Sequence, residues 1–379
     1  MKESAEVVII GGGVSGCGTA YNLAKKGVTD VVILEKNFLC NGATGRCGGG
    51  IRQQFTTETN IRLAMESVSI FEHLSEELGI DIEYDQGGYL IIAYEDEVDQ
   101  FKKNVALQNR MGLESRFISP EEAREIVPNL CIDTIAGATF CQTDGHANPF
   151  KVVQGYAERA REMGVSIEKG TNATGITCED GCITAVKTNR GTIRSGIVVN
   201  AAGAYSRDIA QMVGIELPNK PYRHEILVTE PIEHILDPMI ISFKTGIYFS
   251  QQECGAIIGG IGDPEEPSSY NVKGSLRFLK RMTRTMIDLV PAFGHLNVLR
   301  QWAGLYDVTP DAQPILGWTE GVDGFCQVNG YSGHGFMISP KVTELIAELI
   351  VDGKTSMPID DLNLNRFEGE ITGETYVVG

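Results

Sequence analysis

The sequence of 379 residues predicts an α/β fold in which a parallel-sheet domain carries an inserted α+β domain with a mostly antiparallel sheet. A strand, a glycine-rich turn, a helix and a second strand form a βαβ unit at the N-terminus. A buried strand, another glycine-rich turn and an amphipathic helix recur near the C-terminus. The short strands within residues 222–299 are separated by turns, as in an antiparallel sheet. Both chain ends therefore belong to one domain, and the middle is inserted into it.

This pattern predicts a discontinuous arrangement of domains, because the chain is too long for one simple core. We expect the first domain to comprise residues 1–80, 146–220 and 300–379. The second domain, which we expect to bind substrate, comprises residues 81–145 and 221–299.

The N-terminal unit has the pattern of a dinucleotide site. Glu6–Ile10 predicts a buried strand, residues 17–26 a helix and residues 30–34 a second strand. Between them, GGGVSG matches G-x-G-x-x-G, and Glu35 follows the second strand. The glycines allow a tight turn and a close approach of pyrophosphate to the helix N-terminus, and the acidic residue accepts ribose hydroxyls. The expected dinucleotide contacts here are Gly11, Gly13, Val14, Ser15, Gly16, Glu35 and Lys36.

The pattern alone leaves FAD and NAD both open as the dinucleotide. The next segment, residues 41–52 (NGATGRCGGGIR), is rich in small residues and would let backbone run beside a flat ligand. A flexible surface loop is the alternative for this segment.

The remaining elements follow from periodicity and turn residues. We expect helices over residues 58–78, 96–111, 150–163 and 275–289, and a short helix capped by Ser119 with Pro120 in its first position. Residues 81–93 suggest a hairpin around Gly87-Gly88, and residues 301–317 are interpreted as loop-rich. The expected strands are residues 165–168, 173–179, 182–188, 191–194, 197–200, 223–229, 239–243, 246–250, 256–260 and 324–329.

The C-terminal glycine turn is the stretch NGYSGHGF, residues 329–336. After it, Val342, Leu345, Ile346, Leu349 and Ile350 follow helical spacing, with Pro340 expected in the first turn. A helix N-terminus of this kind stabilises negative charge. His334 is expected to be an orienting or packing group, with a general base as the alternative.

Bulk properties exclude several classes of function. A net charge of −18 argues against binding nucleic acid or anionic lipid. No apolar run approaches the length of a membrane span, and the N-terminus does not resemble a signal peptide, so we expect a cytoplasmic protein. The nine cysteines are scattered without metal-ligand spacing, so we expect reduced thiols and no metal site.

Taken together, the motifs resemble those of the D-amino-acid-oxidase-like FAD oxidoreductases over essentially the whole chain. The resemblance is closest to the β subunits of heterotetrameric sarcosine oxidase and dye-linked L-proline dehydrogenase, with glycine oxidase nearby. The segments that support it are VVIIGGGVSG…VVILEK, RCGGGIRQQF, DGHANPFKVVQGYA, VVNAAGAYS, WAGLYDVTPDAQPILG and NGYSGHGFMISP.

The resemblance implies a Rossmann-like FAD-binding domain of the glutathione-reductase type. It also implies noncovalent FAD, because Gly304 stands where the monomeric family enzymes carry the tethering cysteine. Beyond the N-terminal unit, the implied FAD contacts are Ala43, Thr44, Arg46, Gly49, Gly50, Ala173, Ala202, Gly203, Gly304, Gly333, His334, Gly335, Phe336 and Met337.

The resemblance also implies substrate contacts. Arg52 matches an arginine that binds the substrate carboxylate, a task suited to a guanidinium fork; a surface arginine is the alternative. Tyr248 matches a tyrosine facing the flavin. His224 points toward the same pocket in this interpretation, or is a structural histidine.

Three positions depart from the family pattern. Met337 stands where sarcosine oxidases carry a lysine that helps hold the carboxylate, which argues against sarcosine as substrate. Ile257 aligns with the oxygen-activating lysine of the monomeric enzyme, which favours a dehydrogenase. Pro149 aligns with the histidine that carries FMN in the heterotetrameric enzyme, so covalent FMN is not expected.

The leading hypothesis is oxidation of the C–N bond of a small secondary or primary amino acid resembling proline, sarcosine or glycine. A hydride equivalent would pass to flavin N5, and water would hydrolyse the imine. The chain would be a dehydrogenase-type β subunit with an α-type, iron–sulfur or flavin partner. The alternatives are a self-sufficient oxidase that releases hydrogen peroxide, a flavin-binding subunit without turnover and, more remotely, a nicotinamide dehydrogenase.

Overall fold

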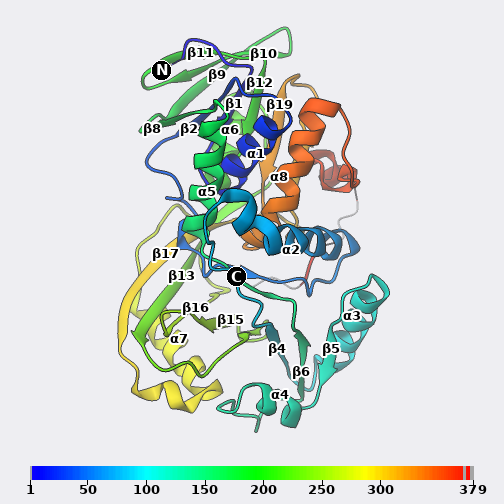
Figure 1. Cartoon of the computed structure of the whole chain (residues 1–379), viewed down its shortest axis with the longest axis vertical. Coiled ribbons are helices and arrows are strands. Elements are labelled where there is room, and N and C mark those ends of the chain that lie inside the picture. Colours follow the sequence, from blue (N-terminus) through cyan, green and yellow to red (C-terminus); the bar gives the residue numbers. More distant parts are fainter. Residues whose placement is uncertain (1, 370–372, 376–379) are drawn as a thin grey trace.

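The computed structural model describes residues 2–369 and 373–375. Two large sheets lie at opposite ends of the long axis of the molecule, with helix α2 between them (Figure 1). The first is a six-stranded sheet in the order β18-β19-β12-β1-β2-β8. Its strands are parallel except for β18, which pairs antiparallel with β19. Their bounds are β1 Val7–Ile10, β2 Val31–Glu35, β8 Ser166–Lys169, β12 Ile197–Asn200, β18 Ile315–Trp318 and β19 Phe325–Asn329.

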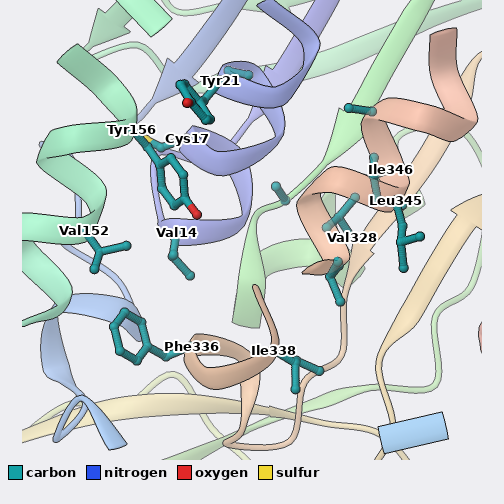
Figure 2. Packing of buried hydrophobic residues seen from close by; sticks show 14 of the residues in the cluster. Val14, Cys17, Tyr21, Val152, Tyr156, Val328, Phe336, Ile338, Leu345 and Ile346 are labelled. Carbon is teal, nitrogen blue, oxygen red and sulfur yellow. The ribbon is translucent and has the colours of Figure 1, made fainter. Parts of the chain in front are cut away.

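Helices cover this sheet and join distant parts of the chain. α1 (Val14–Lys25) packs between α5 (Pro149–Glu162) and α8 (Gly335–Asp352), while α2 (Glu58–Leu78) packs against α8. Figure 2 shows that Val14, Cys17 and Tyr21 of α1 share one core with side chains from α5 and α8. Helices from the N-terminal, middle and C-terminal parts of the sequence therefore share one core beside the six-stranded sheet.

Two small sheets adjoin the first domain. β9 (Ala173–Glu179), β10 (Cys182–Thr188) and β11 (Gly191–Arg194) form an antiparallel sheet. β3 (Gly50–Ile51) pairs with β7 (Gly145–His146). A short helix, α6 (Ser206–Gln211), follows β12.

The second large sheet has eight strands in the order β17-β13-β16-β15-β14-β4-β6-β5. Its pairs are antiparallel except for β14 with β4, so the expectation of a mostly antiparallel sheet is confirmed. The strands are β4 Tyr89–Ala93, β5 Arg116–Ile118, β6 Gly137–Cys141, β13 Lys220–Pro231, β14 Met239–Ser242, β15 Ile247–Gln251, β16 Ala256–Ile261 and β17 Val298–Val308.

Strand alternation divides the second sheet into two faces. Leu90 and Ile92 point into the core shared with α4 (Pro120–Ile126) and α7 (Leu276–Leu289). Tyr89 and Ile91 point to the other face, where Phe101 of α3 (Val98–Arg110) contributes to the core.

Two predicted elements and one predicted boundary differ from the structure in the middle of the chain. Within residues 81–93 only β4 is a strand, so the predicted hairpin is wrong; Asp85 makes an isolated bridge to His146 instead. The segment 301–317 is not mainly loop, because β17 runs to Val308 and pairs with β13 along its length. The expected domain boundary at residues 299/300 falls inside β17, which belongs to the second sheet.

The last helix begins earlier than expected. α8 starts at Gly335, so Pro340 lies in its second turn and not in its first. Proline lacks the N–H that would reach the carbonyl of residue 336. Ser339 Oγ donates to that Phe336 carbonyl at 2.8 Å, so the carbonyl keeps a partner.

Two further properties hold for the described residues. None of their helices is both long enough and apolar enough to cross a bilayer. All nine cysteines are free thiols.

Candidate active site

An elongated cleft of about 380 Å³ opens at the carboxyl ends of the parallel strands. Its walls come from the turn after β1, the end of β2, the loop at 41–47, the turn after β12, and the glycine stretch near α8. Of the predicted cofactor contacts, it is lined by Gly11, Gly13, Val14, Ser15, Glu35, Lys36, Ala43, Thr44, Arg46, Ala202, Gly203, Gly333, Gly335 and Phe336.

Two positions of the first glycine turn leave no room for a side chain. Gly11 has a φ of +119°, and a Cβ there would lie 2.2 Å from the Ala201 carbonyl oxygen. A Cβ on Gly16 would lie 1.9 Å from the Gly11 oxygen. Gly16 is therefore a packing glycine that does not line the cleft, whereas Gly13 does.

Glu35 lines the cleft and also stabilises the first glycine turn through hydrogen bonds to backbone. Its Oε2 accepts from Gly12 N–H at 2.9 Å, and its Oε1 accepts from Asn37 N–H at 2.7 Å. Each carboxylate oxygen keeps a further lone pair, which can accept a ribose hydroxyl.

Two helix N-termini meet at the cleft. Neither α1, with Gly13 at its N-cap, nor α8, with His334 at its N-cap, has a side-chain cap. Thr44 Oγ1 accepts from Val14 N–H at 3.3 Å and joins the loop to the start of α1. The two helices direct backbone N–H groups and positive dipole ends toward one space.

Besides Gly16, two predicted cofactor residues, Ala173 and Gly304, line neither this cleft nor the smaller cavity described below. Ala173 is buried in β9 among core residues of the first domain. Gly304 lies in β17, where a Cβ would be 3.1 Å from that of Arg46. Arg46 itself is fixed by donation from Nη1 to the Ala303 carbonyl at 2.7 Å.

A smaller cavity of about 70 Å³ continues from the cleft toward the second sheet. The two spaces share Cys47, Tyr306, Gly333 and Phe336 as lining residues. The predicted residues that line the small cavity are Gly49, Gly50, Arg52, Tyr248, Gly333, His334, Phe336 and Met337. Its other walls, which the sequence predictions missed, include Tyr89, Met239, Ile241 and Tyr306.

Arg52 is buried, with 3% of its surface exposed, at the wall of the small cavity. Its guanidinium donates to the Gln54 carbonyl and lies 4.1 Å from the centre of the Phe55 ring. Asp144 supports this segment by accepting from Gln53 N–H at 2.8 Å and from Gln54 Nε2 at 2.9 Å. Burial raises the pKa of Asp144 to about 6. The alternative of a surface arginine is therefore excluded.

His224 lies behind the cavity wall. Its ring stacks on Tyr306 at 4.3 Å between centroids and on Tyr248 at 5.6 Å. Burial lowers the pKa of His224 to about 4 and raises the pKa of Tyr248 well above its usual value. At neutral pH the histidine is uncharged and the phenol is protonated.

His334 lies where the glycine stretch enters α8. Its ring is 5.3 Å from the Phe55 ring, and neither ring nitrogen has a hydrogen-bond partner among the described residues. Burial lowers the pKa of His334 to about 4. At neutral pH, His334 is therefore uncharged, and only this neutral imidazole could act as a base.

Asp307, which the sequence predictions missed, fixes the glycine stretch. Its Oδ2 accepts from Gly330 N–H at 2.7 Å, its Oδ1 accepts from Asn219 Nδ2, and its carbonyl accepts from Ser332 N–H at 2.9 Å. Burial raises the pKa of its carboxyl to about 7. The signal lay in WAGLYDVTPDAQPILG, which contains both Tyr306 and Asp307.

Ile257 does not lie at the cavity. It is fully buried on β16 in the core between the second sheet and α7 and lines neither space. The absence of a lysine at this position therefore says nothing about reaction with oxygen.

Comparison with known proteins identifies the family. A family model described as "FAD dependent oxidoreductase" matches residues 6–349. The chain belongs to this family of FAD-dependent oxidoreductases. The predicted family, fold class and FAD cofactor are confirmed.

Several relatives of this FAD-dependent oxidoreductase span nearly its whole length. A sarcosine oxidase subunit beta from Rhodobacter capsulatus is 31% identical over 385 residues, covering 100% of this chain and 92% of the relative. The crystal structure of L-proline dehydrogenase from P. horikoshii has a TM-score of 0.93 and 41% identity, covering 98% and 100% of the two chains. A glycine oxidase from Geobacillus kaustophilus, at 24% identity and a TM-score of 0.90 over 96% and 99%, shares the fold.

The cleft fits the FAD of this family. A dinucleotide needs an extended groove with close backbone at the pyrophosphate, and the turn at Gly11 and Gly13 supplies it. The start of α8 lies at the other end, where both spaces meet. Among the described residues, no group of three or more His, Cys, Asp or Glu side chains could hold a metal ion.

Proposed function

We propose that this FAD-dependent oxidoreductase oxidises the C–N bond of a small amino acid, preferably a secondary one such as proline, and acts as a dehydrogenase. The observation that carries the proposal is the charge pattern of the small cavity. Arg52 provides one buried cation, while Tyr89, Met239, Ile241 and Met337 surround it with aromatic and apolar surface.

One guanidinium suits one carboxylate. Bidentate donation from Arg52 would fix the acid group, and the apolar walls would contact the rest of a small substrate. Met337 lies in this wall, so the cavity lacks at that position the second cation that sarcosine oxidases have in the family pattern. This argues for proline-like substrates over sarcosine.

The surroundings of the small cavity favour the neutral form of the substrate amine, which is the reactive one. His224 and His334 are neutral at pH 7, since burial lowers both pKa values to about 4. An amine placed in this desolvated space would lose its proton more readily, because burial disfavours the charged form. The chemistry supplied by bound FAD is two-electron acceptance from the substrate α-carbon and nitrogen, after which water hydrolyses the resulting imine.

The likeness to L-proline dehydrogenase, at 41% identity over 98% of this chain, supports dehydrogenase activity. The name "sarcosine oxidase subunit beta" of the 31% identical relative supports a partner subunit that takes up the electrons. Noncovalent FAD is part of the proposal, since glycine occupies position 304.

The test is an anaerobic titration of the purified flavoprotein with L-proline, sarcosine, glycine and D-amino acids, followed by the bleaching of flavin absorbance. We expect proline to bleach the flavin at the lowest concentration, and a dye to be reduced under air without stoichiometric peroxide. Faster bleaching by sarcosine or glycine would overturn the substrate assignment. Stoichiometric peroxide would identify an oxidase, and no bleaching by any amino acid would indicate a subunit without turnover.

A further inference from the structure

A segment of the second domain reaches across to the first beside the FAD cleft. Residues 262–275 connect β16 to α7, and we call them the strap. Tyr270 and Val272 of the strap are each 42% exposed. Val272 also lines the FAD cleft.

The strap is fixed to β13 on both sides of Tyr270. Ser268 Oγ and Ser269 N–H each donate to the Pro221 carbonyl at 3.0 Å. Arg223 donates through Nη2 to Glu266 at 2.6 Å and through Nη1 to the Lys273 carbonyl at 2.8 Å. The Arg223 and Glu266 side chains are only 15% and 11% exposed, so this ion pair is largely shielded from water.

The centre of the strap is attached to the first domain. The Tyr270 ring stacks on Tyr205, with centroids 4.9 Å apart and planes inclined by 11°. Tyr270 Oη donates to the Asp208 carboxylate at 3.0 Å. Tyr205 and Asp208 belong to the turn and helix that follow β12.

These contacts lie at the adenosine end of the cleft. Lys36 Nζ is 3.0 Å from the centre of the Tyr205 ring, and Lys36, Tyr205 and Val272 all line the cleft. Lys36 directly follows Glu35, the residue type that binds adenosine ribose in this motif. The strap therefore joins the two domains where the adenosine half of FAD would bind.

We propose that the strap is a gate on the adenosine end, closed by the Tyr270–Tyr205 contact, that FAD must open to enter and to leave. Tyr270 acts as a positioning residue through Tyr205. The inference rests on FAD binding and not on the identity of the amino-acid substrate, so the two proposals fail independently.

The test is the exchange kinetics of FAD. Release is followed by collecting free flavin by ultrafiltration, and binding by the fluorescence change when FAD is added to apoprotein. Tyr270→Ala should release FAD at least about tenfold faster, because the ring stack and a bond to a charged acceptor are both lost. Tyr270→Phe keeps the stack and should fall between wild type and Tyr270→Ala.

A gate makes a second, distinctive prediction, which is that binding of FAD also becomes faster in Tyr270→Ala. A side chain that only contacts FAD would change release alone. Leu276→Ala, an equally apolar truncation of an exposed side chain at the start of α7, is the matched control and should leave both rates unchanged.

Glu266→Gln provides an independent variant if Tyr270→Ala does not fold. It weakens the attachment of the strap to Arg223 without touching Tyr270, and it should also accelerate both rates. Wild-type exchange in a folded Tyr270→Ala or Glu266→Gln protein, or faster release with unchanged binding, would overturn the gate.

Discussion

Among the described residues that line the small cavity, Arg52 is the only side chain that is charged at neutral pH. Two neighbours in sequence set its place, because Gln54 provides a carbonyl acceptor and Phe55 a ring surface. Asp144, distant in sequence, accepts from the side chains of Gln53 and Gln54. The guanidinium is thus positioned before substrate arrives, which reduces the entropy cost of binding a carboxylate.

Replacing Arg52 by Ala should weaken apparent affinity for the amino acid by at least about 2 kcal/mol, or about thirtyfold, because the substrate carboxylate loses its buried partner. Concentration dependence of anaerobic flavin bleaching measures this. Arg52→Lys should recover part of the lost affinity. Arg124→Ala, at an exposed position on α4, is the control and should leave the affinity unchanged. Unchanged affinity in Arg52→Ala would remove the residue from the substrate site.

The pKa of His224 gives a prediction about stability. A histidine whose pKa is about 4 when folded and near 6.5 when unfolded stays neutral in the native state while the unfolded chain binds a proton. Its contribution is intact above pH 6.5 and is lost as pH falls toward 4, by up to about 3 kcal/mol.

Urea unfolding of wild type and His224→Phe between pH 4 and 8 tests this, since Phe keeps the ring stack without a titrating group. The variant should lose less stability between pH 6.5 and 4. Asp144 and Asp307 act in the opposite direction, because their contribution to stability is lost as pH rises toward their raised pKa values. Both residues are present in both proteins, so their effect cancels in the comparison. Parallel curves for the two proteins would contradict the prediction.

At the scale of elements, the sequence predicted best where the pattern was local. α2, β9, β10, β11 and β12 have the predicted bounds, because periodicity and glycine turns define them without help from distant residues. β17 was missed because Gly304 and the mixed polarity of its sequence resemble a loop, while its order comes from pairing with β13 far along the chain. α8 continues past Pro340, and Ser339 Oγ donates to the Phe336 carbonyl that the proline leaves without its N–H partner. A rule about proline alone does not predict this.

The same limit applies to the site. The glycine motifs, Arg52 and Tyr248 could be predicted because short motifs specify them. Tyr89 and Met239 could not, since only the meeting of the second sheet with the glycine stretch before α8 brings them to a cavity.

Asp307 gives a prediction about the glycine stretch as an element. It accepts from two donors, so Asp307→Asn must direct an amide N–H₂ toward one of them and should reduce the unfolding free energy by about 1–3 kcal/mol. The double exchange Asp307→Asn with Asn219→Asp restores a donor for each acceptor and should recover part of this loss in chemical denaturation. Equal stability of wild type and the single variant would show that the pair does not hold the loop.

At the scale of the whole molecule, FAD should stabilise both domains together. The cleft is lined by separate segments between residues 11 and 336, including Val272 and β17 residues of the second domain, so both domains contribute to one binding site. Ligand that binds only the native state stabilises it by about 4 kcal/mol at a thousandfold excess over its dissociation constant.

Removing FAD should therefore lower the Tm of the full chain, and adding FAD back should restore it in a concentration-dependent way. Differential scanning calorimetry measures this, with FMN, which lacks the adenosine half, as the matched control. An FAD-independent Tm would show that the cleft forms without contributing to global stability.

The joining of the two chain ends also has a consequence for how the protein is made. The turn at Gly11–Gly16 is synthesised long before α8, yet its helix α1 packs against α8, and Asn22 of α1 donates to Thr343 of α8 at 3.1 Å. The cofactor cleft has only one of its two glycine-rich ends until residues 329–336 and α8 have been synthesised. The complete FAD cleft therefore forms only after α8 has been synthesised, and a nascent chain stalled in the middle domain leaves the apolar face of α1 without its α8 partner.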